Sequence, residues 1–362
     1  MKILYAIQGT GNGHLSRARD VIEILKTKGE LDILVSGTEN EVHLDVPVKY
    51  TFKGLSFVFG KQGGIDLLAT YKKGNLKRLF KEIKSLPVEQ YDLVISDFEP
   101  VSAWACRMKN KPCIGLSNQV AVINKKSPKS KKTDPLGKSI LKNYAPVTEA
   151  YGYHFRAYDK DIYTPLIRKR IRQGKNTFKG HYLVYLPAHG DNRIIKVLSE
   201  IPGIKWSAYS KTCKQEYKCK NIHFKPVNNE AFIIDLLSCT GIICAAGFQT
   251  PAEALFLEKN LLVIPMKGQY EQQCNAMALK EMGVIVLKSL KHKHLNKIKN
   301  WIIEPKTIHV NYPDLTETII NRIISKHTNT PHKFTAVLGN IPYSVKKFRQ
   351  LSLGKILLQI SS

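Results

Sequence analysis

Short apolar runs separated by amphipathic stretches fill the first part of the chain. Runs at 2–7, 31–36, 91–97 and 111–117 have the length of buried strands. Between the first two, apolar residues recur at steps of three and four positions: Leu15, Ala18, Val21, Ile22 and Leu25. This spacing predicts a helix, and residues 101–109 predict a shorter one. Strands buried on both faces that alternate with helices predict a parallel α/β sheet.

The second part of the chain repeats this alternation. Apolar runs predict strands at 181–187, 204–210, 221–227, 241–247 and 261–266, and helices are expected at 193–201 and 271–283. Two such halves, joined once, predict two facing doubly wound Rossmann-like domains. We expect a first domain over residues 1–165, a linker over 166–180, a second domain over 181–325 and a basic tail over 326–362.

Basic residues interrupt this pattern in several places. The formal net charge of the 362-residue chain is +27, so its surface should attract anions such as nucleic acid, anionic lipid or phosphorylated small molecules. Residues 72–86 predict a basic amphipathic helix, which either lies on an anionic membrane or packs its apolar face on the core. Residues 124–142 predict a lysine-rich loop. The tail at 326–362 either packs on the first domain or contacts a membrane.

Several protein classes are excluded by composition. No apolar run reaches the ~18–20 residues of a membrane-spanning helix, and the N-terminal apolar run is too short for a signal peptide. The 7 cysteines show no pair with the two-residue gap of a zinc knuckle. These features predict a cytoplasmic protein with reduced thiols.

The first candidate site is the loop at 9–14, which reads Gly-Thr-Gly-Asn-Gly-His. His14 occupies the position of the last glycine in the dinucleotide fingerprint, and the Gly-Lys-Ser/Thr ending of a phosphate-cradling loop is absent. Neither nicotinamide binding nor ATP hydrolysis is therefore favoured. At a helix start beyond the carboxyl end of a strand, His14 is placed as a general base or as a cap of the loop.

Two further candidates follow strands of the second half. In the stretch 241–255 a strand runs into Gly247, Thr250 is a candidate N-cap, and Pro251 fits the first helical position. Glu253 follows three positions after Thr250, so it completes a capping box or serves a ligand. The segment 268–275 carries polar side chains suited to hydroxyl recognition.

Together these motifs resemble the nucleotide-sugar glycosyltransferases of the GT-B fold, in particular the UDP-glycosyltransferases and the lipid II-forming N-acetylglucosaminyltransferases. The stretch AAGFQTPAEAL is similar to their donor motif, EQQCNA at 271–276 to the downstream Asp-Gln-x-x-Asn-Ala, and GTGNGHLSRA to their N-terminal glycine loop. The resemblance covers about residues 1–325. It implies two Rossmann-like domains that face a deep inter-domain cleft.

The resemblance also implies roles for individual residues. His14 would deprotonate an acceptor hydroxyl, and Asp97 would orient it. Glu253 would bind the ribose of the donor nucleotide, and the backbone around Val227 would contact its base. The remaining expected donor-binding residues are Gly11 and Gly13 of the glycine loop, His189 near the phosphates, Gly247, Phe248, Gln249 and Thr250 around the diphosphate, and Glu271, Gln272 and Gln273 near the sugar.

One position departs from the family pattern. Ala245 stands where plant enzymes have a histidine, so a phosphate contact is missing, and Arg17, Arg193 or a lysine is a candidate replacement. UDP is the expected nucleotide, although this departure leaves other nucleotides open. No Asp-x-Asp pair suggests a catalytic metal, and we expect neither a metal nor a cofactor beyond the nucleotide-sugar co-substrate.

The leading prediction is an inverting glycosyltransferase that acts on an anionic lipid or a cell-envelope glycan, peripherally at the inner face of the membrane. A nucleotide-sugar 2-epimerase of the same fold, a non-enzymatic nucleic-acid-binding protein and a degenerate sugar-nucleotide sensor are the alternatives. The chain has no helix-turn-helix, zinc or RNA-binding motif, so no specific nucleic acid is expected as a partner.

Overall fold

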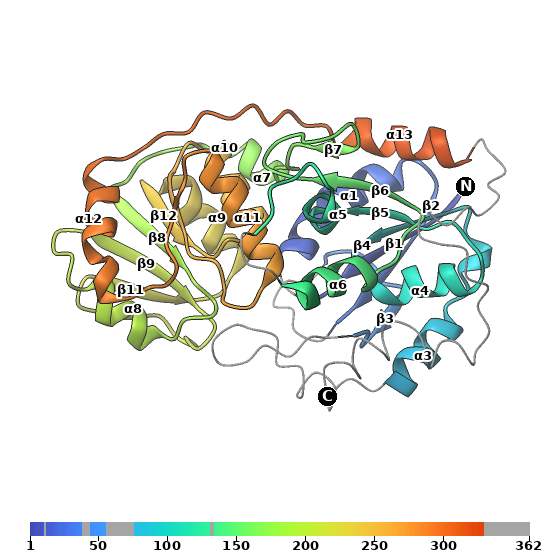
Figure 1. The fold of residues 1–362 in the computed structure, drawn as a ribbon, viewed down its shortest axis with the longest axis horizontal. Coiled ribbons are helices and arrows are strands. Elements are labelled where there is room, and N and C mark those ends of the chain that lie inside the picture. The colour runs from blue at the N-terminus through green and yellow to red at the C-terminus, as the bar shows by residue number, and fades with distance from the viewer. Residues whose placement is uncertain (11, 38–43, 56–75, 131–133, 329–362) are drawn as a thin grey trace.

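The computed structural model describes residues 1–10, 12–37, 44–55, 76–130 and 134–328. They form two α/β units, each built on a seven-stranded sheet (Figure 1). Every strand pair in the first sheet is parallel, and so is every pair in the second except β10 with β11. The expected pair of facing Rossmann-like α/β domains is confirmed.

The first sheet has the strand order β3-β2-β1-β4-β5-β6-β7. Its strands are β1 (Lys2–Gln8), β2 (Glu30–Ser36), β3 (Tyr50–Phe52), β4 (Leu93–Asp97), β5 (Ile114–Ser117), β6 (Glu149–Tyr153) and β7 (Ile162–Tyr163). Its helices are α1 (Asn12–Lys26), α3 (Leu76–Ser85), η1 (Val88–Gln90), α4 (Pro100–Met108), α5 (Asn118–Ile123) and α6 (Pro135–Asn143). The chain then reaches the second unit through α7 (Lys169–Arg172).

The second sheet has the order β10-β11-β9-β8-β12-β13-β14. Its strands are β8 (His181–Tyr185), β9 (Lys205–Ser210), β10 (Tyr217–Cys219), β11 (Ile222–Pro226), β12 (Gly241–Cys244), β13 (Asn260–Val263) and β14 (Ile285–Val286). Its helices are α8 (Asp191–Leu198), α9 (Asn229–Ser238), α10 (Gln249–Phe256), α11 (Tyr270–Glu281), η2 (His292–His294) and α12 (Leu295–Ile303).

The two domains share one apolar core. Side chains from the α1 face of the first sheet and from the α10 face of the second belong to a single buried cluster, in which Phe155 lies against Phe248 at 5.2 Å between ring centroids. The opposite face of each sheet has a core of its own. Buried apolar area stabilises a fold roughly in proportion to its size. This shared core therefore stabilises the contact between the domains in addition to the packing within each domain.

The last described helix, α13 (Thr316–Thr328), lies on the first domain although the preceding α12 belongs to the second (Figure 1). It packs against α1 and β4, and the ion pairs of Lys28 with Glu317 and Arg322 with Asp161 attach it there. The boundaries drawn at 165 and 180 stay predictions. The boundary drawn at 325 divides α13, because a domain boundary read from chain order misses a segment that crosses back.

Two predictions about the basic segments change. The described part of 72–86 is α3, whose Leu79 and Ile83 are buried in the first-domain core, so its apolar face is packed inside the protein rather than available to a membrane. The segment 124–142 is not a loop throughout, because α6 begins at Pro135. The Asp134 side chain caps α6 by accepting from the Gly137 N–H at 2.7 Å. The prediction that the tail at 326–362 packs on the first domain or contacts a membrane falls mainly on residues outside the described part, 329–362.

Candidate active site in the cleft between the domains

A cavity of about 670 Å³ lies between the two domains. The first domain contributes residues of the β1–α1 loop, of the start of α1, of the loop after β4, and of α5 and α6. The second contributes the loops that follow β8, β9, β11, β12 and β13. These loops leave the carboxyl ends of parallel strands, which is the edge of such sheets where ligands bind. The expected inter-domain cleft is therefore present.

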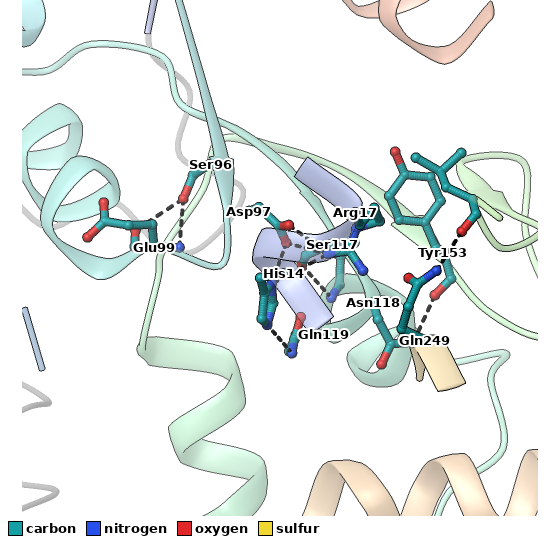
Figure 2. Close-up of polar contacts among 12 residues, drawn as sticks. His14, Arg17, Ser96, Asp97, Glu99, Ser117, Asn118, Gln119, Tyr153 and Gln249 are labelled. Atoms are coloured by element: carbon teal, nitrogen blue, oxygen red, sulfur yellow. Dashed lines mark hydrogen bonds and ion pairs between the residues drawn. The ribbon is translucent and has the colours of Figure 1, made fainter. Parts of the chain in front are cut away.

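His14, Arg17 and Asp97 are hereafter called the acid–base cluster (Figure 2). His14 and Arg17 line the first-domain side of the cavity, and the fully buried Asp97 lies behind them. The helical pattern that begins at 12 places His14 and Arg17 one turn apart on α1. Asp97 ends β4, whose neighbour in the sheet is β1. His14 Nδ1 lies 2.8 Å from an Asp97 carboxylate oxygen, and Arg17 Nη2 lies 2.8 and 2.6 Å from the two oxygens.

The electrostatics of the cluster favour an ionised Asp97. Burial by itself would raise the pKa of this carboxyl, but the charge of Arg17 and the hydrogen bonds from Arg17 and His14 outweigh burial and hold the pKa below its usual value. An ionised carboxylate accepts hydrogen bonds only, so His14 donates from Nδ1. In the neutral imidazole, Nε2 of His14 then carries the lone pair, and this is the form a general base requires.

The loop after Asp97 is strained in a way that helps to shape the site. Phe98 has φ of 57°, a left-handed conformation uncommon for a residue with a side chain. Its ring lies 4.8 Å from that of Tyr144, and both line the cavity. The next residue, Glu99, is fully buried and caps α4 by accepting from the backbone N–H groups of Val101 and Ser102. Backbone strain of this kind is concentrated at functional sites.

On the opposite wall, β12 leads into the start of α10. Gly247, Phe248, Gln249 and Thr250 all line the cavity. A Cβ atom added to Gly247 would meet open space, so this backbone faces the cavity directly. The first backbone N–H groups of a helix have no partner within it and carry a partial positive charge, which suits a diphosphate.

Glu253 does not complete a capping box. The helix begins at Gln249 with Phe248 as its N-cap, so Thr250 lies inside the first turn and the capping prediction is wrong. The Glu253 carboxylate is fully buried and accepts from Arg168 Nε and Nη2 at 2.5 and 2.7 Å and from Gln249 at 2.9 Å. Glu253, one turn into α10, therefore binds Arg168 of the predicted linker instead of capping the helix.

Arg168 lines the cavity, and its Nη1 also donates to the Asn229 side chain at 2.8 Å. Sequence reasoning did not single out Arg168, because it lies in a basic run without a motif. Arg17 and Arg193 were the named candidates for the missing phosphate contact. Arg17 is committed to Asp97, and Arg193 is exposed on α8, whereas Arg168 and Lys211 are the basic side chains that reach the cavity from the second half of the chain.

Some of the remaining predicted donor residues line the cavity, others lie beside it or elsewhere, and one is outside the described residues. Gly13, Val227, Glu271 and Gln272 line the cavity together with the start of α10. Gln273 instead accepts from Ser130 at 3.1 Å across the domain seam. The loop of His189 reaches the cavity through Pro187 and Ala188, and Gly11 lies outside the described residues. Burial and nearby Arg193 lower the pKa of His189.

Gln119 is a further residue that the sequence did not reveal. It lies at the start of α5, 5% exposed, with its amide nitrogen 3.0 Å from Glu271 and 3.3 Å from His14 Nε2 (Figure 2). Burial raises the pKa of Glu271, although His14 and the Gln119 hydrogen bond partly oppose this shift. The signal in the sequence would have been a polar Ser-Asn-Gln run directly after a buried strand.

Comparison with known proteins agrees with this geometry. The family model for glycosyl transferase family 1 matches residues 1–304. The chain belongs to that family. It is a glycosyltransferase with the GT-B fold, and the prediction of a non-enzymatic nucleic-acid-binding protein is set aside.

Solved structures support the same fold at low sequence identity. MurG of Acinetobacter baumannii aligns over 90% of this chain and 100% of its own, with 15% identity and a TM-score of 0.55. Arabidopsis thaliana UGT89C1 complexed with UDP aligns over 100% and 99%, with 12% identity and a TM-score of 0.53. The spinosyn forosaminyltransferase SpnP aligns over 90% and 95%, with 15% identity and a TM-score of 0.52. Among curated protein sequences, none is similar enough to count as a match.

Within the described residues, no helix combines the length and the apolar character needed to cross a bilayer.

Proposed function

We propose that this enzyme transfers a sugar from a UDP-sugar to an acceptor hydroxyl with inversion at the anomeric carbon. The observation that carries the proposal is a single cavity that joins His14 on one wall to the start of α10 on the other. A base and a diphosphate site that face one cavity supply the two groups a direct displacement needs. The UDP complex of UGT89C1 supports the choice of nucleotide only as a precedent in the same fold.

In the proposed reaction the acceptor oxygen attacks the anomeric carbon while the bond from that carbon to the diphosphate oxygen breaks. The electron pair of that bond leaves with the nucleoside diphosphate, and the acceptor proton moves to His14 Nε2. Asp97 stabilises the imidazolium that forms, and a positioned base of this kind contributes typically 10²–10⁴-fold to the rate.

The departing diphosphate gains negative charge as the bond breaks. We propose that backbone N–H groups at the start of α10 and the side chains of Arg168 and Lys211 stabilise that charge. These groups would allow the transfer to proceed without a metal ion. Retention of activity after dialysis against a chelator, with Mg²⁺ added back as the comparison, tests this part.

The acceptor belongs to an anionic lipid or a cell-envelope glycan in this proposal. Its support is the net charge of +27, since basic side chains near an anionic bilayer contribute about 1 kcal/mol each. Because the apolar face of α3 is packed in the core, the attraction between the protein and an anionic membrane would be electrostatic. Co-sedimentation with phosphatidylglycerol vesicles but not phosphatidylcholine vesicles at low salt is the expected result, and equal binding to both contradicts it.

The donor site is tested by thermal stabilisation with UDP, dTDP, GDP, ADP and CDP. A ligand at 100 times its dissociation constant stabilises the fold by about 2.7 kcal/mol. Gly247→Ala should fold normally, because the added carbon meets open space, yet lose the stabilisation because that carbon occupies the ligand's place. Gly190→Ala is the matched control, since its added carbon also meets open space. If no nucleotide stabilises the wild type, the proposed donor is wrong.

A further inference from the structure

The amide of Gln119 joins the two walls of the cavity. Its nitrogen lies 3.0 Å from a carboxylate oxygen of Glu271 on α11 and 3.3 Å from Nε2 of His14 on α1. His14 and Gln119 belong to the first domain and Glu271 to the second. One side chain therefore touches both the proposed base and the proposed reader of the donor sugar.

The neighbours of the amide determine which of its ends faces them. A carboxylate oxygen accepts, so the group that meets Glu271 is the NH₂ end of Gln119. His14 donates to Asp97 from Nδ1 at 2.8 Å, which leaves a lone pair on Nε2. The two hydrogens of one NH₂ group can thus satisfy Glu271 and Nε2 of His14 together.

The charged groups that face His14 come from three elements. Arg17 lies on α1 itself, Asp97 ends β4, and Glu271 begins α11. The uncharged amide of Gln119 also faces His14, and its N–H occupies the Nε2 lone pair that must receive the acceptor proton. In this arrangement Asp97 orients His14 as a base, but the hydrogen bond from Gln119 keeps Nε2 from accepting a proton.

We propose that Gln119 is a positioning residue that caps the Nε2 atom of His14 until a donor sugar occupies Glu271. The proposal rests on the function assigned above to His14 and Glu271. A sugar hydroxyl that binds Glu271 competes with Gln119 for the carboxylate and lets the amide turn away from Nε2. The base is then released only when a donor is in place, and Gln119 links the two events.

The cap has a chemical purpose. A free base beside a bound nucleotide sugar can deprotonate water instead of the acceptor. The water oxygen then bonds to the anomeric carbon, the nucleoside diphosphate leaves with its electron pair, and His14 takes the proton, so the donor is hydrolysed to free sugar. The cap acts in the interval after the nucleotide has bound and before the sugar reaches Glu271, when Gln119 still holds Nε2 and His14 cannot activate a stray water.

A competing explanation is that closure of the cleft as a whole shields His14. The α11 seam, formed by the bond from Ser130 to Gln273 at 3.1 Å and the contact between Asn118 and Asn275 at 3.5 Å, also connects the domains. A test must therefore separate loss of one hydrogen bond from opening of this seam. Ser130→Ala removes a seam contact and leaves Gln119 and Glu271 in place.

The first experiment needs no substrate. Diethyl pyrocarbonate acylates the unprotonated nitrogen of imidazole, and peptide mass spectrometry gives its rate at His14, with exposed His309 as the internal reference. Gln119→Met keeps the bulk but cannot donate, so His14 should react about fivefold faster, the factor that one ordinary hydrogen bond contributes. Glu271→Ala should raise the rate as well, whereas Glu271→Gln, which retains an acceptor, should not.

Two results overturn the proposal. One is an unchanged rate at His14 in Gln119→Met. The other is an increase in the acylation rate at His14 in Ser130→Ala as large as that in Gln119→Met. That result would mean that closure of the α11 seam, rather than Gln119, protects His14. Because His309 is far more exposed than His14, its unchanged rate in every variant shows that the reagent concentration is the same.

The second experiment measures the partition of the donor between transfer and hydrolysis. With UDP-sugars, Gln119→Met should raise the ratio of hydrolysis to transfer, whatever its effect on total turnover. The increase is at most about fivefold, because the cap acts only before the sugar is seated. An unchanged ratio overturns the proposed purpose of the cap. If reagent protection behaves as expected but no nucleotide sugar is consumed by the wild type, the proposed function fails while the cap stands.

Discussion

In the first domain, the ionisable groups beside the cavity are held by that same domain: Asp97 fixes His14, and Arg17 neutralises Asp97. In the second domain, the corresponding carboxylate, Glu253, is held by Arg168, which lies outside that domain's sheet on the linker. The base is thus organised before any ligand arrives, whereas the donor site depends on how the linker joins the domains. Chemistry and donor binding should respond differently to mutation.

The largest expected effect separates these two halves directly. His14→Ala removes the base and should lower kcat about 10³-fold while the affinity for the nucleotide stays within about twofold, because His14 lies on the other wall. Steady-state kinetics and calorimetric titration measure the two quantities. A large loss of nucleotide affinity would show that the walls are not independent.

The second effect concerns stability as well as binding. Glu253→Gln leaves Arg168 buried without a counter-charge, which should destabilise the fold by about 3 kcal/mol. It should also weaken nucleotide binding, because Glu253 no longer holds Arg168 in place at the cavity. The double variant Arg168→Met with Glu253→Gln should recover most of the stability and none of the binding. Denaturant unfolding with and without nucleotide provides the comparison, and a single variant as stable as the wild type contradicts the account.

A third effect should appear on acidification. His154 is fully buried between the domains near Phe248, and burial lowers its pKa to about 3. The unfolded chain binds a proton near pH 6.5, so this contribution to stability is complete above that pH and is lost as the pH falls toward 3. From pH 7 to pH 5 the wild type should lose about 2 kcal/mol more than His154→Asn. Equal losses in unfolding curves at the two pH values would refute this.

The smallest effect is expected at the α11 seam. Ser130→Ala removes the partly buried hydrogen bond from the Ser130 hydroxyl to Gln273, and such a bond is worth about 1 kcal/mol or less. Stability should fall by no more than that, and kcat should change less than about twofold. A much larger loss of activity would mean that the seam, rather than the linker pair, sets the relation between the domains.

Much of the fold was predictable because buried parallel strands and amphipathic helices have distinct periodicities. The strands at β1, β2, β4, β8, β12 and β13 follow from apolar runs in the sequence. Short strands such as β7 and β14 have too few residues to show a pattern. The helix α6 was missed because a lysine-rich composition concealed its Asp134-Pro135 start.

At the site, local motifs indicated where ligands approach but not which side chains meet. The residues at 247–250, Glu271 and His14 were identified from their position after strands. The capping interpretation of Glu253 failed because α10 begins at Gln249, and the partner that Glu253 binds instead, Arg168, is 85 positions away. Gln119 could not be found for the same reason, since its contacts with His14 and Glu271 span 105 and 152 positions.

The sequence by itself determined the α/β alternation, the two-domain organisation, the family motifs and the chemical types of group at each strand end, because these depend on neighbours along the chain. Only the tertiary structure decided that Asp97 and Arg17 share one ion pair, that the linker supplies the partner of Glu253, and that a glutamine joins the two walls. Such pairings depend on how two sheets are placed against each other. A hydrogen bond about 3 Å long between residues far apart along the chain produces no periodic pattern in the sequence.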